Sequence, residues 1–213
     1  MKKLVLFYLL INSGFAFGQE TYESVYVPVS TLERTYEGTI YLFPNWEGKF
    51  EIYDSDNKGF SLANLNYNVL TKMIESKFTK DSIFRFEAKK INFIKYASKR
   101  YRFYDIRESL ELFQELYISD NVRFLKGFNV TYKEGYINPL TQAYIQKEKC
   151  YIVEKYFLKL NNKNFIELKL NKHSILKQLG DKASQIKKYA SISKLRFKSE
   201  RDLFMIFQYY DTL

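Results

Sequence analysis

The sequence predicts a fold of the α+β class: an antiparallel, β-rich single domain with two or three helices at its C-terminal end. The chain contains 19 Tyr and 19 Phe against 3 Pro, and aromatic side chains favour half-buried, pleated surfaces. From about residue 171 the apolar residues change from a period of two to a period of 3.6, which indicates helices. We therefore assign residues 19–213 to one domain whose helical segment starts at about residue 171.

The first 18 residues have the pattern of a secretory signal peptide. Lys2 and Lys3 supply positive charge, residues 4–11 are an unbroken apolar run, and Ala16 and Gly18 are small residues before a cleavage position. A membrane anchor is the alternative, but this run is well short of the roughly 20 apolar residues that a bilayer requires. We predict a signal peptide over residues 1–18 and an exported protein that is periplasmic, on the cell surface or secreted.

The first half of the domain predicts short strands joined by turns. Strands are expected at residues 25–27, 39–43 and 49–53, with a dense turn signal at residues 54–59. After this turn the alternation of apolar residues slips by one position near Ala63 and Asn64. A slip inside a period of two predicts a β-bulge at this point.

The middle of the chain continues with alternating aromatic residues and two hairpins. Phe84 and Phe86 alternate with polar residues, as do Tyr101 and Phe103. The hairpins are expected at residues 115–118 with 122–125, and at residues 156–160 with 165–170. Residues 109–117 also contain apolar residues at helical spacing, so a helical start to this segment is an alternative.

The C-terminal residues predict three short helices. Residues 173–179 form the first, ended by Gly180, and Asp181 can cap the second. Ser199 and Asp202 have the spacing of a capping box at the start of the third helix. Its apolar stripe consists of Leu203, Ile206, Phe207 and Tyr210. A stripe of this kind must be buried against the sheet or a partner.

The charge of the chain indicates an anionic partner or a well-solvated surface. Lys and Arg number 34 against 24 Asp and Glu, so the formal net charge is +10. For an exported protein the anionic partner would be a lipid headgroup, lipopolysaccharide, an anionic glycan or an acidic envelope protein, and nucleic acid is not expected. The protein could then be peripheral to the outer membrane.

Histidine and cysteine chemistry has little support. His173 and Cys150 are single residues of their types, which excludes a multi-histidine zinc site and an intrachain disulfide. We expect Cys150 to be a buried apolar residue. Asp54 and Asp56 resemble the start of a calcium loop, but Lys58 occupies a ligand position, so we interpret the segment as a hairpin turn. No catalytic residue, metal ligand or cofactor is predicted.

One segment has the character of a binding surface. In residues 99–104 basic and aromatic side chains alternate, so Arg100 and Arg102 share one face while Tyr101 and Phe103 point inward. Guanidinium groups at this spacing suit phosphate or carboxylate. We therefore name Lys99, Arg100 and Arg102 as candidate binding residues and expect that replacing both arginines leaves folding nearly unchanged. The alternative is an ordinary strand with one wet, basic face.

The chain also resembles a recurring type of exported envelope protein of Bacteroidota. The resemblance rests on the turn at residues 46–49, the segment from residue 113 to residue 126, the hairpin that starts at Tyr156, and the tail from Ile175 to Tyr210. It implies a β-rich envelope protein with a terminal helical segment. It implies no active-site residue.

Three functions remain in order of preference. The first is a non-enzymatic interaction or scaffold component of the bacterial cell envelope, which requires no catalytic set. The second is a binding protein for an anionic lipid or glycan through the basic-aromatic face. The third is a carboxylate-based hydrolase, because two distant carboxylates can meet only in the folded protein.

Overall fold

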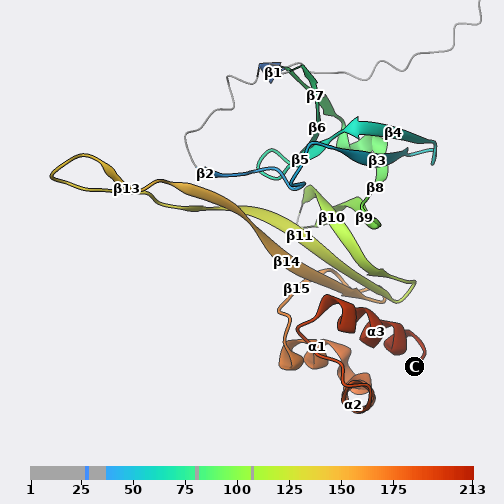
Figure 1. Cartoon of the computed structure of the whole chain (residues 1–213). Coiled ribbons are helices and arrows are strands. Elements are labelled where there is room, and N and C mark those ends of the chain that lie inside the picture. The colour runs from blue at the N-terminus through green and yellow to red at the C-terminus, as the bar shows by residue number, and fades with distance from the viewer. Residues whose placement is uncertain (1–26, 29–36, 80–81, 107) are drawn as a thin grey trace, which may run out of the picture.

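The computed structural model describes residues 27–28, 37–79, 82–106 and 108–213. The signal peptide expected over residues 1–18 lies outside the described residues. The described chain is rich in antiparallel strands, and its helices follow all of the strands (Figure 1). The predicted α+β class is confirmed at this level.

The large sheet has the strand order β15-β14-β11-β10-β9-β8-β3-β4, and β2 pairs with β14. All of these pairs are antiparallel except that between β2 and β14. The strands are β2 (Glu37–Gly38), β3 (Glu47–Asp54), β4 (Gly59–Asn64), β8 (Ile91–Tyr96), β9 (Lys99–Ile106), β10 (Ser109–Ile118), β11 (Val122–Lys133), β14 (Lys149–Leu160) and β15 (Ile166–Leu168).

A small sheet and a short hairpin complete the strands. The small sheet has the order β1-β7-β6-β5, and the hairpin joins β12 to β13. The strands are β1 (Val27–Pro28), β5 (Asn66–Asn68), β6 (Met73–Thr79), β7 (Ser82–Phe86), β12 (Tyr136–Ile137) and β13 (Tyr144–Gln146). Figure 1 shows the small sheet on the side of the large sheet that is away from the helices.

The bulge predicted near Ala63 and Asn64 coincides with a register shift between β3 and β4, from the pair Glu47–Asn64 to the pair Phe50–Leu62. A crossing between the two sheets follows it directly. Strand β4 ends at Asn64 in the large sheet, and β5 begins at Asn66 in the small sheet. Leu65 lies between them and is fully buried. The phase of the apolar residues slips because the two strands bury their side chains against different neighbours.

The strand predicted at residues 39–43 is wrong, since only an isolated bridge between Tyr41 and Asn68 is present there. Ile40 and Leu42 each make one backbone hydrogen bond to residues 67–69, without forming a continuous ladder. At Phe43 the buried side chain of Asn66 takes the place of a neighbouring strand. It accepts a hydrogen bond from the Phe43 amide at 2.9 Å and donates one to the Phe43 carbonyl at 2.9 Å. Backbone polar groups inside a protein need partners, and here an amide side chain supplies them.

Residues 109–117 form a strand, so the helical alternative is wrong. Strand β10 pairs with β9 from Ser109 to Glu115 and with β11 from Gln114 to Ile118. Hydrogen bonding to strands on both sides outweighs the helical spacing of a few apolar residues. Both predicted hairpins are confirmed as β10–β11 and β14–β15.

The C-terminal helices are α1 (Lys172–Leu179), α2 (Ala183–Ile192) and α3 (Glu200–Asp211). The hydroxyl group of Ser199 accepts a hydrogen bond from the Asp202 amide at 3.3 Å, which confirms the predicted cap of α3. Asp181 does not cap α2. It lies in a 3-10 turn (Gly180–Lys182), and its carboxylate accepts from the adjacent Lys182 amide.

The helices bury their apolar stripe against one face of the large sheet. Leu203, Ile206, Phe207 and Tyr210 of α3 are buried as predicted, in a cluster that includes Phe124 of β11. A second cluster lies between the large and small sheets and includes Phe50 and Tyr67. None of the helices in the described ranges has the length and apolarity that crossing a bilayer requires.

Candidate functional site

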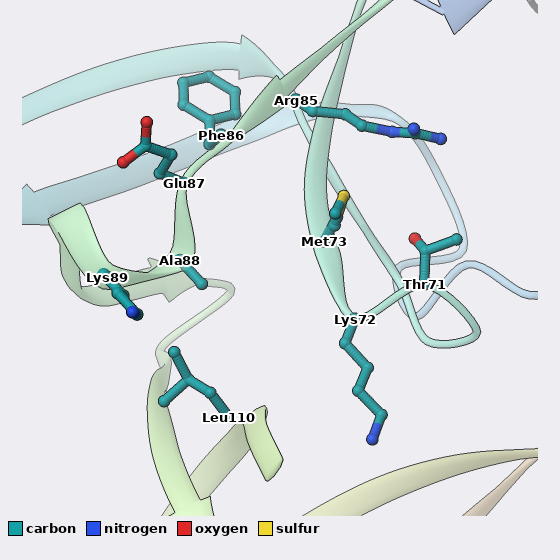
Figure 2. A pocket seen from close by; sticks show the side chains of 9 residues that line it. All are labelled: Thr71, Lys72, Met73, Arg85, Phe86, Glu87, Ala88, Lys89 and Leu110. Atoms are coloured by element: carbon teal, nitrogen blue, oxygen red, sulfur yellow. The ribbon is translucent and has the colours of Figure 1, made fainter. Parts of the chain in front are cut away.

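A cavity of about 530 Å3 opens where the small sheet meets β10 (Figure 2). Its wall combines apolar side chains with three cationic ones. Figure 2 shows Lys72 and Met73 on one side of the opening and Ala88, Lys89 and Leu110 on the other. The lining residues are Thr71, Lys72, Met73, Arg85, Phe86, Glu87, Ala88, Lys89 and Leu110.

A buried asparagine builds the turn that carries Lys72 to the cavity. The side-chain oxygen of Asn68 accepts hydrogen bonds from the amides of Leu70 and Thr71, both at 3.1 Å, and its carbonyl accepts from the Lys72 amide at 2.8 Å. Lys72 then has a φ of 61°, in the left-handed region. Non-glycine residues rarely adopt this conformation, and it occurs where surrounding contacts enforce it.

The Lys72 side chain crosses from the small sheet to the large one. Its ammonium nitrogen lies 2.6 Å from the Ser109 hydroxyl oxygen and 2.7 Å from Glu111 Oε1. The Lys72 side chain is 42% exposed and that of Glu111 is 23% exposed. The pair therefore joins the two sheets at the cavity wall, with part of the Lys72 side chain still exposed.

Arg85 is fixed by a buried carboxylate behind the cavity. Its Nε lies 3.0 Å from Glu75 Oε1, and the Glu75 side chain has no exposed surface. The Tyr41 hydroxyl donates to Glu75 Oε2 at 3.0 Å. Burial, and next the charge of Glu75, raise the pKa of the Tyr41 hydroxyl above its usual range. Tyr41 thus stays neutral, and Arg85 is the cation that compensates Glu75.

Lys89 differs from the other two cations. Among the described residues it has no hydrogen-bond or ion-pair partner. It lies in a 3-10 turn (Ala88–Lys90) directly after β7. The neighbouring Glu87 points away from Lys72 and Met73 in Figure 2, and its carboxylate lies 3.6 Å from Lys90. Lys72 and Arg85 are paired with carboxylates, so among the described lining residues Lys89 is the cation that the cavity presents without a partner, next to apolar side chains.

The residues predicted to bind anions, Lys99, Arg100 and Arg102, lie in β9 and do not line this cavity. Lys99 is exposed. Arg100 and Arg102 share one face, and both approach the buried carboxylate of Glu115, with Nε–O distances of 2.9 Å and 3.5 Å. The Arg100 guanidinium also lies 3.9 Å from the centre of the Phe93 ring.

This pairing changes the expectation for the two arginines. The Glu115 side chain is only 6% exposed, and a buried carboxylate that loses its cations is costly. Replacing both arginines should therefore destabilise the protein, contrary to the prediction from sequence. The sequence could not reveal the pair because Glu115 comes from β10, where it lies opposite Arg100 in the register.

The cavity residues escaped the sequence analysis because Lys72, Arg85, Lys89 and Leu110 come from separate segments with no shared motif. One local signal was present. Asn66 and Asn68 stand inside an apolar, strand-like stretch, although asparagine is depleted in strands. Buried amides of this kind indicate that the backbone needs unusual partners there.

The other singled-out residues have structural roles. Asp54 Oδ1 accepts hydrogen bonds from the Asp56 and Lys58 amides, as expected for a hairpin turn. Cys150 is buried, and burial raises the pKa of its thiol. His173 is exposed in the first turn of α1. Over the described ranges, His, Cys, Asp and Glu side chains form no group of three or more that could hold a metal ion.

Comparisons with known proteins identify no relative. No family model matches the chain, and no curated protein or solved structure matches it. The resemblance to envelope proteins of Bacteroidota therefore stays a prediction.

Proposed function

We propose that this chain is a non-enzymatic binding component of the cell envelope and that its cavity holds an amphiphilic anion. The observation that carries the proposal is the composition of the cavity wall. Met73, Phe86 and Leu110 line the same space as Lys72 and Lys89. Ligand pockets are typically about 300–1,000 Å3, mostly apolar, with a few polar groups that orient the ligand. The periplasmic or cell-surface location rests on the N-terminal signal expected from sequence.

The cationic and the apolar lining side chains suit a ligand that has an anionic part and an apolar part. A carboxylate or phosphate group would lie near Lys89, which forms no ion pair with any carboxylate in the described part of the chain. Lys72 is already paired with Glu111, so it would contribute less to binding. An alkyl or other apolar portion would lie against Met73, Phe86 and Leu110. Fatty acids and lipid phosphates share this chemistry, and both occur in cell envelopes.

The geometry gives less support to the other functions considered. Within the described chain, Glu87 alone among the cavity-lining residues is acidic, whereas glycoside hydrolysis requires two carboxyl groups that face one bond. The basic-aromatic face has Glu115 between its two arginines, so an anion there must compete with a built-in carboxylate. An acidic envelope protein as partner is compatible with the net charge of +10.

A titration with soluble probes tests the proposal. Octanoate, octyl phosphate and 1-octanol, each below its aggregation limit, would be titrated into the protein by calorimetry. We expect both anions to bind more tightly than the alcohol, and a preference between the two distinguishes a fatty acid from a lipid phosphate. Lys89→Gln should weaken both anions by about three- to tenfold, because one charge contact to the head is lost.

Two further variants make the test specific. Ala88→Phe should fill part of the cavity and weaken all three probes. Lys58→Gln removes an exposed lysine of the β3–β4 turn, outside the cavity, and should leave binding unchanged. The proposal is wrong if neither anion binds, or if Lys89→Gln and Ala88→Phe bind both anions as the parent does.

A further inference from the structure

A two-stranded arm projects from the large sheet. Strands β11 and β14 pair residue by residue from Val122 with Leu160 to Lys133 with Lys149, and the chain between them forms the β12–β13 hairpin. Figure 1 shows this ribbon extending well beyond the other strands. We call residues 131–151 the arm and residues 135–146 the arm tip.

The arm tip exposes a group of large apolar side chains. Leu140 is 92% exposed, and Tyr144 and Ile145 are 64% and 63% exposed. Tyr136 and Ile137, on the paired strand, are also exposed. Single exposed apolar residues are ordinary, but a contiguous apolar surface marks a contact with a protein or a membrane.

The charges of the arm are separated from its apolar residues. Residues 135–146 contain no charged side chain, whereas Lys133, Glu134, Lys147, Glu148 and Lys149 stand at the base of the tip. Lys133 and Lys149 lie directly opposite each other in the β11–β14 pair. Like charges at opposite positions destabilise a sheet. Lys149 has Glu37 at 3.0 Å, and an external anion beside Lys133 would relieve the rest of the repulsion.

Several backbone amides of the arm tip donate hydrogen bonds within the tip itself. The Asn138 side-chain oxygen accepts hydrogen bonds from the amides of Leu140 and Thr141, and the Asn138 carbonyl accepts from the Gln142 amide at 2.9 Å. The Asn138 amide donates to the Ala143 carbonyl at 2.9 Å. Water could satisfy these groups in any exposed loop, but an apolar environment could not.

We infer that the arm tip inserts into the headgroup region of an anionic lipid bilayer. Leu140 and Ile145 would enter the apolar boundary, and Tyr136 and Tyr144 would lie at the interface, where tyrosine is favoured. Lys133 and Lys147 at the base would meet lipid phosphates. Glu134 and Glu148 offset part of this attraction, and the basic excess of the whole chain adds to it. A second copy of the chain fits less well, because basic residues outnumber acidic ones in each copy and the copies repel. This inference is independent of the cavity.

Vesicle binding tests the inference on the full chain. The parent protein should sediment with vesicles of phosphatidylcholine and phosphatidylglycerol, and less with phosphatidylcholine alone. Leu140→Asp should lower the partition coefficient about tenfold or more, because a charge replaces the leucine that would be buried in the lipid. Ile192→Asp is the matched control: Ile192 is 72% exposed on α2, away from the arm, and its replacement should leave partitioning unchanged.

A spectroscopic readout places the tip directly. In Tyr144→Trp, the emission added to that of Trp46 in the parent should shift to shorter wavelength with anionic vesicles and be quenched by brominated acyl chains. The inference is overturned if the parent does not bind anionic vesicles or if Leu140→Asp binds them as the parent does. It is also overturned by two results together: the protein forms dimers that Leu140→Asp dissociates, and lipid does not change the emission of Tyr144→Trp. The tip would then contact a second copy of the chain.

Discussion

The ammonium group of Lys126 lies 2.6 Å from Glu200 Oε1, which joins strand β11 to the first turn of α3. Lys126 is almost fully buried, and its ammonium also lies 3.2 Å from Glu154 Oε1. The Tyr156 hydroxyl donates to the same Glu200 oxygen at 2.6 Å. One buried cation thus connects the helical layer to two adjacent strands, at the edge of a mainly apolar interface.

Lys126→Met should lower the free energy of unfolding by about 1–3 kcal/mol, because two carboxylates and a tyrosine lose their shared cation. Glu154 and Glu200 are partly exposed, so water compensates some of the loss. Urea denaturation measures the change. In the Lys126→Met/Glu200→Gln double variant the two losses should be less than additive, since the residues act on one interaction. Additive losses would show that the pair is not coupled.

The double variant Arg100→Ala/Arg102→Ala should be destabilised by about 1–3 kcal/mol, after allowing for solvent screening of partly exposed side chains. The reason is that the buried Glu115 carboxylate then has no cation beside it. The Tyr104 hydroxyl, which donates a hydrogen bond to it at 2.6 Å, remains. Adding Glu115→Gln should restore part of the stability. Lys99→Ala, at an exposed position of the same strand, should change it by less than about 0.5 kcal/mol. A double variant as stable as the parent contradicts the structural role of the arginines.

The loss of folding stability at acidic pH should depend on Asp202. The Arg196 amide donates to its carboxylate at 3.0 Å, and the Arg196 guanidinium adds to the effect, so the Asp202 pKa lies below its ordinary value of 3.8. A carboxyl with a lowered pKa stabilises the folded state above the ordinary pKa, and this contribution is lost as the pH falls through the folded-state value. Urea midpoints measured over acidic pH should therefore fall less steeply in Asp202→Asn. Equal slopes would exclude this contribution.

Gly38→Ala should break the pairing of β2 with β14. Gly38 has a φ of 111°, and a Cβ atom there would lie 1.9 Å from the Cys150 carbonyl oxygen, a backbone atom that cannot move aside alone. We expect a loss of about 1–3 kcal/mol in thermal or urea denaturation and faster labelling of the buried Cys150 thiol. Gly59→Ala is the comparison, because its Cβ would meet only the Tyr53 ring, and its loss should be smaller. Unchanged labelling of Cys150 in Gly38→Ala would argue that the contact is not required.

Local patterns were sufficient for several elements of the fold. The stripe of Leu203, Ile206, Phe207 and Tyr210 and the cap at Ser199 were predictable because a helix repeats its environment every three to four residues and begins at a defined side chain. The β14–β15 hairpin was predictable because a turn-rich stretch separates two alternating runs. These signals lie within a few residues of each other, where chain geometry alone decides which side chains meet.

Segments whose partners are distant in sequence were not predictable in the same way. Residues 39–43 have a strand-like composition, but the Asn66 side chain takes both backbone hydrogen bonds of Phe43, and only an isolated bridge forms at Tyr41. The slip at Ala63 and Asn64 predicted the register shift between β3 and β4, but not the change from one sheet to the other that follows it. A sequence pattern shows that the surroundings of a segment change. Only the folded structure shows which element forms the new surroundings.

The sequence by itself determined the strand-rich body, the helical C-terminal segment and the alternation that puts Arg100 and Arg102 on one face. The tertiary structure alone decided that Glu115 lies beside these arginines and that Lys72, Lys89 and Leu110 surround one cavity. The physical reason is the separation along the chain between the residues that interact. Periodicity and capping act through adjacent turns and strands of one segment, whereas ion pairs and cavities join groups that only sheet order and packing bring together.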